Sequence, residues 1–284
     1  MKRPRRVALV AKDHPVARTL AQKIGRELTR RGYSVEYDRE TARALGARRG
    51  FALQRAPADA ELVVSLGGDG TLLAAARAAS QGSQILGVNT GTLGFLTGVS
   101  RAKALRLLDA ALEGRLEADV RHFLEVRVGR GRAMRTSYVL NDAVLTRGAL
   151  SRIARFTLRL DGKPFSSMRA DGVILASPTG STAYNLSAGG PIVFPEVRAY
   201  VITPICPHAL TQRPVVLPAD RVVEVTAEAG SPEGIYLTLD GQEGLALESG
   251  AAVAVTGSPR TVTLLRPPGQ DYFATLSEKL NWGA

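Results

Sequence analysis

Hydrophobic positions in the first third of the chain follow two alternating patterns. Short apolar runs at residues 7–10, 62–66 and 85–88 predict buried β-strands. Apolar residues recur every three or four positions over residues 16–28 and 105–112, which is the spacing of one helix face. Strands that alternate with helices of this length predict a mostly parallel sheet covered on both faces.

From about residue 120 the apolar spacing changes to every second residue. Residues 124–128, 156–160 and 235–239 alternate apolar and polar side chains, and the last two runs end at Asp161-Gly162 and Asp240-Gly241. Alternating runs bounded by Asp-Gly pairs are typical of antiparallel hairpins. The second part of the chain is therefore predicted to be β-rich and sandwich-like.

This change of pattern sets the expected fold class and domain boundaries. We expect an α/β N-terminal domain with a mostly parallel sheet, over residues 1–118, and a β-rich sandwich-like C-terminal domain, over residues 119–266. Residues 272–282 return to helical spacing. The tail, residues 267–284, is therefore assigned to the first domain.

Composition excludes several classes of protein. The chain has 284 residues, of which 45% are hydrophobic and 22% charged, a balance that rules out a mostly disordered protein. No apolar run approaches the roughly 20 residues of a transmembrane helix or the about 7–15 residues of a secretory signal. We therefore expect a cytoplasmic protein with no membrane partner. The single cysteine, Cys206, is expected to be a small buried residue.

The net charge of +11 does not by itself indicate a nucleic-acid partner. The basic residues are scattered along the chain, and no dense basic stretch alternates with aromatic residues. A compositional bias accounts for this charge as well as a ligand does. The alternative is that the basic residues bind nucleotide phosphates. We expect no specific nucleic-acid partner.

The strongest local motif is Gly67-Gly68-Asp69-Gly70-Thr71, between a predicted strand and a predicted helix. Its glycines let the backbone approach a phosphate closely, and the helix N-terminus offers free N–H groups. A carboxylate in that position either holds Mg²⁺ or accepts a proton from an attacking hydroxyl. The alternative is that Asp69 only caps the helix. Neither the P-loop nor the Gly-x-Gly-x-x-Gly dinucleotide fingerprint occurs in the chain.

Three further segments carry polar residues at strand ends or inside apolar runs. Residues 89–95 form a second Gly/Thr-rich loop, which either shares phosphate contacts or simply connects a strand to a helix. Asn141-Asp142 interrupts an apolar run, so a ligand or internal hydrogen bonds must satisfy its polarity. Residues 177–190 combine small hydroxyl side chains with Tyr184, which suits a stacked planar ring or, alternatively, an ordinary helix cap with a core tyrosine.

Taken in order, these motifs resemble the signature of the NAD kinase family. The resemblance runs from about residue 60 to residue 282. The Gly-Gly-Asp-Gly-Thr turn alone is shared with lipid kinases, but its combination with Thr179-Gly180-Ser181-Thr182-Ala183-Tyr184 is specific. The family usually has Asn-Glu where this chain has Asn141-Asp142, so the carboxylate here is one methylene shorter.

The resemblance implies transfer of the γ-phosphoryl group of ATP to the 2′-hydroxyl of the adenosine ribose of NAD, giving NADP. It implies that a divalent ion, Mg²⁺ or Mn²⁺, accompanies ATP, with no metal site of the protein's own. It also implies an active site between the domains, and a homodimer or homotetramer that completes the site.

By position, the resemblance makes Asp69 the proton acceptor and a substrate contact, while Asn141 and Asp142 hold the adenosine part of NAD. Arg152 and Arg169 match positions that face the NAD phosphates and the nicotinamide side. The other residues that it places in the binding site are Gly70, Asp171, Thr179, Thr182, Ala183, Tyr184, Asn185, Leu186, Ser187 and Gln242.

Two alternatives stay open on the sequence. A diacylglycerol- or sphingosine-type lipid kinase shares the Gly-Gly-Asp-Gly-Thr turn, although the hydroxyl-rich residues 177–187 argue against an apolar lipid slot. A non-catalytic dinucleotide-binding protein is the other, and it needs no carboxylate at Asp69.

Overall fold

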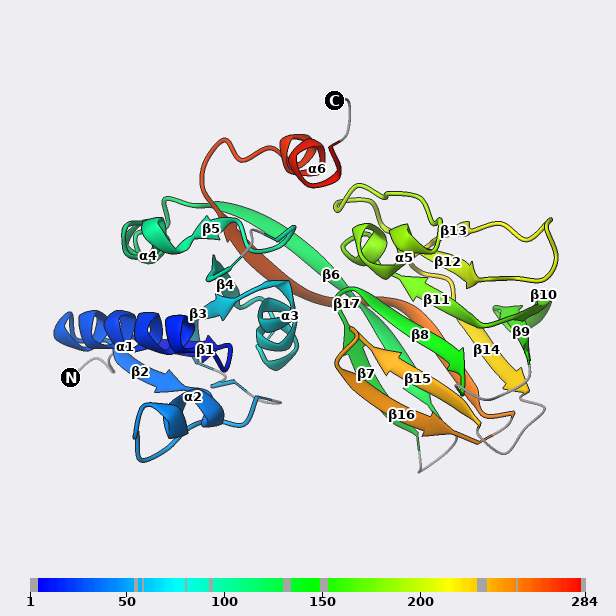
Figure 1. The fold of residues 1–284 in the computed structure, drawn as a ribbon, viewed down its shortest axis with the longest axis horizontal. Coiled ribbons are helices and arrows are strands. Elements are labelled where there is room, and N and C mark those ends of the chain that lie inside the picture. The colour runs from blue at the N-terminus through cyan, green and yellow to red at the C-terminus, as the bar shows by residue number, and fades with distance from the viewer. Residues whose placement is uncertain are drawn as a thin grey trace. The chain divides into compact units, whose positions relative to one another are not determined.

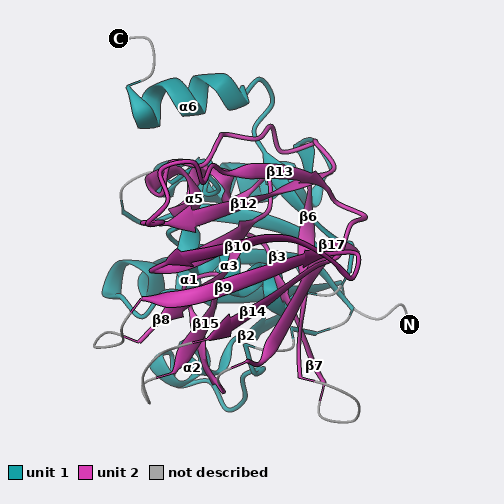
Figure 2. Cartoon of the chain, turned by 90° about the vertical axis from the view of Figure 1, so that its right-hand side faces the viewer, with its two compact units in different colours: residues 1–120, 261–284 teal, residues 121–260 magenta. Residues whose placement is uncertain are grey.

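The computed structural model divides the chain into two compact units, coloured separately in Figure 2. Unit 1 comprises Met1–Val120 with Thr261–Ala284, and unit 2 comprises Arg121–Arg260. The structure describes residues 5–53, 56–57, 59–79, 81–91, 94–129, 134–148, 153–228, 234–248 and 250–281.

Unit 1 alternates strands with helices, as its apolar spacing predicts (Figure 1). Strand order in its sheet is β2-β1-β3-β4, followed by the end of β17, and all of these pairs are parallel. Strand β5 pairs with β4. The elements are β1 (Arg6–Ala11), α1 (Pro15–Arg30), β2 (Ser34–Tyr37), α2 (Arg39–Ala44), β3 (Ala60–Gly67), α3 (Asp69–Ala78), β4 (Gln84–Asn89), β5 (Val99–Ser100), the 3₁₀ turn η1 (Arg101–Lys103), α4 (Ala104–Leu112) and α6 (Tyr272–Leu280).

Helix α1 shows how local sequence sets these elements. Its N-cap is His14, whose ring nitrogen accepts a hydrogen bond from the Val16 N–H at 3.3 Å, and Pro15 occupies the first turn. Gly32, with a φ of +83°, ends the helix. Ile24 and Leu28 are fully buried on the face that joins the sheet residues in one core cluster.

Unit 2 is an antiparallel sandwich. One sheet has the order β13-β12-β11-β8-β15-β16, and the other contains β10-β9-β14 next to β17, with β6 paired to β7 and β17. The strands are β6 (Glu117–Val128), β7 (Arg135–Val139), β8 (Asp142–Arg147), β9 (Ala154–Leu160), β10 (Lys163–Ala170), β11 (Gly172–Ala176), β12 (Ala199–Ile205), β13 (Val215–Pro218), β14 (Val223–Glu228), β15 (Ile235–Leu239), β16 (Glu243–Leu247) and β17 (Ala252–Arg266). A 3₁₀ turn, η3 (Gly180–Thr182), and the short helix α5 (Tyr184–Ser187) follow β11.

The core of unit 2 lies between the two sheets. Alternate residues such as Phe156 and Leu158 on one sheet and Leu175 and Leu237 on the other are fully buried in one cluster. The predicted pair Asp161-Gly162 turns β9 into β10, with φ values of +48° and +79°. Asp and Gly are among the residues that tolerate two positive φ values in a hairpin turn.

Two strands, β6 and β17, contain the residues at which the chain passes from one unit to the other. Among the helices of the described residues, none combines the length and apolar character needed to cross a bilayer.

Candidate active site

Asp69 is the first residue of α3, directly after the carboxyl end of β3. The helix is capped by Gly68 and receives no side-chain cap, so Asp69 does not have the capping role left open by the sequence. Its carboxylate bonds instead to the segment that follows β4. Oδ2 accepts from the Phe95 N–H at 2.8 Å, and Oδ1 accepts from the Leu96 N–H at 3.1 Å and the Thr97 N–H at 3.0 Å.

The Thr97 side chain provides a fourth hydrogen bond to the same carboxylate. Its hydroxyl donates to Asp69 Oδ1 at 3.0 Å and accepts from Asn89 Nδ2 at 2.8 Å. Thr97 and Asn89 are both buried, whereas Asp69 is half-buried. The carboxylate is therefore held by the loop, and Asp69 as a residue is partly exposed.

The two glycine-rich loops of unit 1 lie together because their strands are neighbours. Strands β3 and β4 pair in parallel, with Gly67 opposite Asn89, and the Thr90 N–H bonds to the Gly67 carbonyl at 3.2 Å. In open α/β sheets, ligands bind at the carboxyl ends of such strands. The second loop therefore begins beside the first. Thr92 and Leu93 of that loop lie outside the described residues.

At two glycines the backbone lies so close to a neighbouring side chain that there is no room for a Cβ. A Cβ on Gly94 would come within 2.6 Å of Asp69 Oδ2. A Cβ on Gly67 would come within 2.7 Å of Thr71 Cβ. Any larger residue at either position would displace the turn or the carboxylate.

Unit 2 carries a polar turn between β7 and β8, at residues 140–142. The Asp240 carboxylate accepts from the backbone N–H groups of Leu140, Asn141 and Asp142, at 3.1, 2.7 and 3.2 Å. Ser177 holds the other side, because its N–H donates to the Asn141 carbonyl at 2.8 Å and its hydroxyl to the Leu140 carbonyl at 2.5 Å. Internal partners therefore satisfy the backbone of this turn.

The side chains of Asn141 and Asp142 are buried to different extents and have different surroundings. Asn141 Oδ1 is buried and accepts no hydrogen bond from any described residue. Burial raises the pKa of Asp142 from 3.8 to about 7, and the nearby Asp240 carboxylate adds to the effect. Buried polar groups without partners cost free energy, so a ligand that donates to them would bind favourably here.

The segment 177–190 packs against this turn. A Cβ on Gly180 would come within 2.6 Å of the Asn141 Cα. Thr179 is buried, and its hydroxyl accepts from Arg121 Nη1 at 3.1 Å. Tyr184 is 46% exposed, which excludes the core tyrosine that the sequence left as an alternative.

Not every predicted binding residue in this segment exposes its side chain. Asn185 is fully buried, donates to the Ser181 and Pro191 carbonyls at 2.9 and 3.0 Å, and accepts from the Thr203 hydroxyl at 2.6 Å. Its internal hydrogen bonds hold the segment in shape. Ser187 is exposed, and the partly exposed residues are Thr182, Ala183 and Leu186.

Asp171 and Arg169 lie at the other end of β8 from Asp142. Asp171 follows β10 and forms an ion pair with Arg147, the last residue of β8, at 2.7 Å. Five residue steps of a strand separate Asp142 from Arg147, which is about 17 Å. Arg169 is exposed on β10. Within one chain, these two residues are therefore remote from the Asn141-Asp142 turn.

The remaining residues predicted from the sequence differ in exposure and in their place in the fold. Gln242 is exposed just after the Asp240-Gly241 turn, beside the Asn141-Asp142 backbone. Gly70 is exposed in the first turn of α3. Arg152 lies outside the described residues. The expectation for Cys206 is wrong, because this residue is exposed with a φ of +46°, in the turn that ends β12.

Sequence reasoning missed Thr97 and Arg121, and it did not predict the hydrogen bonds that Asn89 and Asp240 make in these sites. The Asp240-Gly241 pair predicted a hairpin turn, but nothing in its spacing shows that the Asp240 carboxylate reaches residues about 100 positions away. The described residues contain no group of three or more His, Cys, Asp or Glu side chains placed to hold a metal.

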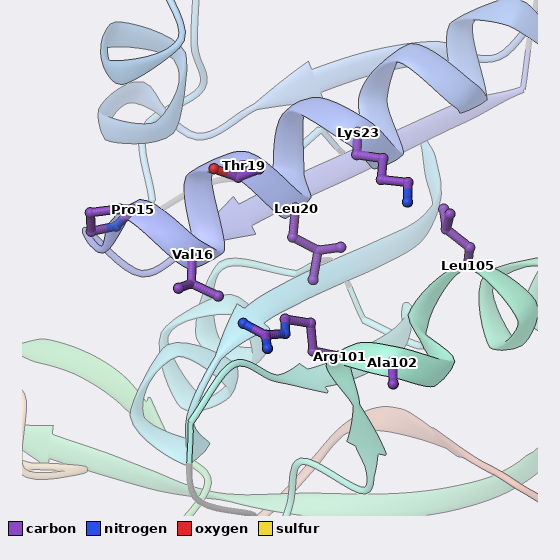
Figure 3. Close-up of a pocket in the computed structure, with 8 residues that line it drawn as sticks. All are labelled: Pro15, Val16, Thr19, Leu20, Lys23, Arg101, Ala102 and Leu105. Carbon is purple, nitrogen blue, oxygen red and sulfur yellow. The ribbon is translucent and has the colours of Figure 1, made fainter.

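A separate hollow of about 520 Å³ lies along α1, opposite η1 and α4 (Figure 3). None of the predicted site residues lines it. Its lining residues are Pro15, Val16, Thr19, Leu20, Lys23, Arg101, Ala102 and Leu105.

Phosphoryl transfer needs a turn that can approach phosphates, a fixed carboxylate for the attacking hydroxyl, and polar groups that hold the acceptor. Unit 1 contains a glycine-rich turn and a carboxylate held by the neighbouring loop, and unit 2 contains a polar turn with a buried side-chain oxygen that lacks a donor. These features are typical of a kinase. The family model described as "ATP-NAD kinase N-terminal domain" matches residues 1–116, and "ATP-NAD kinase C-terminal domain" matches residues 140–266. The chain belongs to the NAD kinase family.

Individual relatives agree with this assignment. The NAD kinase of Trichlorobacter lovleyi is 42% identical over 98% of this chain and 99% of that protein, and the NAD kinase of Aromatoleum aromaticum is 43% identical over 98% and 94%. Yeast NADH kinase complexed with NADH has a TM-score of 0.90 at 25% identity, covering 100% of this chain and 89% of that one.

An NAD kinase from Archaeoglobus fulgidus in complex with ATP has a TM-score of 0.74 at 26% identity, covering 97% and 98%. These relatives give no support to a lipid kinase or to a non-catalytic binding protein.

Proposed function

We propose that this enzyme transfers the γ-phosphoryl group of ATP to the 2′-hydroxyl of the adenosine ribose of NAD, giving NADP and ADP. The observation that carries the proposal is the Asp69 carboxylate, held by four hydrogen bonds from residues 95–97 at the carboxyl end of β3. Positioning and charge stabilisation, rather than covalent catalysis, provide most of the acceleration of such a transfer.

Asp69 accepts the proton of the attacking hydroxyl through Oδ2. Three of the four hydrogen bonds go to Oδ1, and only the Phe95 N–H goes to Oδ2. An ionised carboxylate offers about four lone-pair sites over its two oxygens. Oδ2 therefore keeps the capacity to accept the proton of the 2′-hydroxyl. The 2′-hydroxyl oxygen attacks the γ-phosphorus, and the bond between the γ-phosphorus and the bridging oxygen of ADP breaks.

The donor is proposed to bind at the Gly67-Gly68-Asp69-Gly70 turn. The first N–H groups of α3 are directed to this turn, and the positive end of the helix dipole favours phosphate. ATP binds as its complex with Mg²⁺ or Mn²⁺, which neutralises charge on the triphosphate. Unit 1 is accordingly proposed as the phosphate-binding domain, residues 1–118 with 267–284.

The acceptor is proposed to bind in the β-rich domain, residues 119–266. Asn141 Oδ1 and the Asp142 carboxylate are the groups that accept hydrogen bonds from the adenosine part of NAD, which suits the lack of an internal donor to Asn141 Oδ1 and the burial of Asp142. Tyr184 is exposed enough to stack on a ring. The other proposed contacts of NAD are Gly70, Thr179, Thr182, Ala183, Leu186, Ser187 and Gln242, with Asn185 acting through the shape of its loop.

Arg169 and Asp171 are proposed to act in a homodimer or homotetramer, with Arg152 beside the NAD phosphates. The support is the separation of about 17 Å between Asp142 and the Asp171–Arg147 pair along β8. In such an oligomer, a second copy of the chain supplies Arg169 and Asp171 to the site that contains Asn141 and Asp142. We also propose that the enzyme acts in the cytoplasm, where both substrates are available.

We expect NAD to stabilise the protein strongly, and the Asn141→Ala variant much less. A ligand at 100 times its Kd stabilises the folded state by about 2.7 kcal/mol. Loss of one hydrogen bond, about 1 kcal/mol or somewhat more, weakens binding up to about tenfold and roughly halves this stabilisation. Thermal melts with and without NAD measure it. An equal rise of Tm in both proteins would remove Asn141 from the binding site.

We expect NAD binding at pH 7 to release protons from Asp142. Its pKa in the free protein is about 7, so the carboxyl is about half protonated at that pH. Hydroxyl groups that donate to the carboxylate favour its charged form and lower its pKa. NAD affinity should therefore rise as the pH increases towards 7 and then level off. Calorimetry in two buffers of different ionisation enthalpy measures the released protons.

The same pKa has a consequence for the free protein. Between pH 4 and 7 the folded state binds more protons than the unfolded state, in which Asp142 has its ordinary pKa of 3.8. The contribution of Asp142 to the stability of the free protein should therefore fall as the pH rises through this range. Asp142→Asn is the control, since it should remove both this fall and the proton release. Buffer-independent binding heat in the wild type would contradict the assignment.

A coupled assay for NADP formation tests the proposed reaction. The purified protein is incubated with ATP and NAD, with Mg²⁺ present or removed by a chelator, and a parallel reaction replaces NAD by a diacylglycerol acceptor. NADP formation that depends on both ATP and the divalent ion is the expected result. Phosphorylation of the lipid alone would overturn the proposal.

A further inference from the structure

A chain of buried hydrogen bonds connects the end of β4 to Asp69. Asn89 is the last residue of β4 and is 4% exposed, and Thr97 is 0% exposed. Asn89 Nδ2 donates to Thr97 Oγ1 at 2.8 Å, and Thr97 Oγ1 donates to Asp69 Oδ1 at 3.0 Å. The three side chains form one path within unit 1.

The chemistry of the groups fixes the direction of every bond in this path. The Gly91 N–H donates to Asn89 Oδ1 at 2.7 Å, so the oxygen of the Asn89 amide faces Gly91 and its NH₂ faces Thr97. An NH₂ group only donates, so Thr97 Oγ1 must accept from it. The single hydroxyl hydrogen of Thr97 is then committed to Asp69, because an ionised carboxylate only accepts.

We propose that Thr97 is a positioning residue for the phosphoryl transfer, with Asn89 setting the direction of its hydroxyl. This inference rests on the proposed function of Asp69. The Thr97 N–H and hydroxyl both bind Oδ1, and together with the Leu96 N–H they occupy that oxygen. Rotation of the carboxylate is thereby opposed, and Oδ2 stays the oxygen that faces the acceptor hydroxyl.

The loop backbone alone does not hold the carboxylate in this way. Without the hydroxyl, Oδ1 keeps two N–H donors and Oδ2 keeps one, so the preference for one orientation of the carboxylate is weaker. A hydrogen bond to a charged group is among the stronger ones in proteins. Its loss should affect the reacting geometry more than the binding of either substrate.

The test is Thr97→Val, which replaces the hydroxyl by a methyl group of similar volume. We expect kcat to fall about tenfold or more, while KM for NAD and for ATP stays within about twofold. Thr97→Ser, which keeps the hydroxyl, should restore most of kcat. Thr97→Ala removes the hydroxyl without overfilling the site and should lose as much kcat as Thr97→Val. Thermal melts identify the variants that fold.

Thr41→Val is the matched control in the same unit. Thr41 is also buried, and its hydroxyl also bonds to an aspartate, Asp38, at the start of α2. It should lower the Tm with kcat unchanged, as a merely structural threonine would. Folded Thr97→Val and Thr97→Ala variants with the kcat of the wild type, or a Thr97→Ser variant as slow as Thr97→Val, would overturn the positioning role.

The outcome at Asp69 separates this inference from the proposed function. If Asp69→Asn keeps the turnover of the wild type, the proposed function of Asp69 itself fails. If Asp69→Asn is slow while Thr97→Val is fully active, only the role of Thr97 fails.

Discussion

Replacement of Asp69 by Asn should lower kcat by about 10²- to 10⁴-fold, the range typical of general acid–base assistance. The amide keeps nearly the same shape, and its oxygen can still accept the hydrogen bonds that Oδ1 receives from Leu96 and Thr97. It cannot take up the proton of the attacking hydroxyl. Steady-state kinetics of NADP formation measure the loss, and we expect NAD to bind the variant still, as followed by calorimetry.

Asp38→Asn provides the control for loss of an aspartate carboxylate in the same unit. Asp38 is 3% exposed and caps α2 by accepting from the Glu40 and Thr41 N–H groups, at 3.0 and 3.1 Å. Its replacement should lower the free energy of unfolding and leave kcat unchanged. Unchanged turnover in Asp69→Asn, or an equal loss in both variants, would remove Asp69 from the role of proton acceptor.

Gly180→Ala should weaken NAD binding by about 10- to 100-fold and destabilise unit 2. The added Cβ would lie 2.6 Å from the Asn141 Cα and 2.5 Å from its carbonyl carbon, where only backbone atoms are available to move. The shift displaces Asn141 and Asp142 together, and two lost polar contacts of about 1 kcal/mol or more each account for the weaker binding. Overpacking of this kind typically costs about 1–3 kcal/mol of stability.

The measurements are NAD titration by calorimetry and thermal melts of the free protein. Gly244→Ala is the matched control, because Gly244 lies in β16 with no atom within 4 Å of the added Cβ. It should change both quantities little. If Gly180→Ala binds NAD as tightly as Gly244→Ala does, the packing of residues 177–190 on Asn141 does not support the site.

Local patterns in the sequence predicted the fold class because each pattern reports which side of an element is buried. The four-residue spacing from Val16 to Leu28 gave α1, and the alternation over residues 156–160 gave β9, whose apolar side chains face the core. The Asp161-Gly162 pair marked the turn after β9, since Asp and Gly both tolerate positive φ values.

Elements with weak patterns were missed. Strand β2 has four residues, all only partly buried, and α2 has six, so neither shows enough periods to be recognised. Strand β17 contains Gly257-Ser258-Pro259, residues typical of a turn, yet it continues from Ala252 to Arg266. It pairs with β14 before this segment, with β4 after it, and also with β6, and such pairing is not written in local sequence.

The sequence by itself determined the two kinds of architecture and the chemical character of the motifs, because burial periodicity and residue chemistry are local properties. It also singled out Asp69 and the pair Asn141-Asp142. Only the tertiary structure decided what each side chain faces. The Thr97 hydroxyl turns towards Asp69, and the Asp240 carboxylate closes the turn at residues 140–142.

These hydrogen bonds join residues that are far apart in the sequence, by 28 positions for Thr97 and Asp69 and by 100 for Leu140 and Asp240. They depend on which strands become neighbours. The parallel pairing of β3 with β4 brings Asn89 and Thr97 to Asp69, and the antiparallel pairing of β8 with β15 brings Asp240 to Asn141. That choice is made by packing over the whole of each sheet, so the partners of the Asp69 carboxylate follow from the fold and not from the motif that contains it.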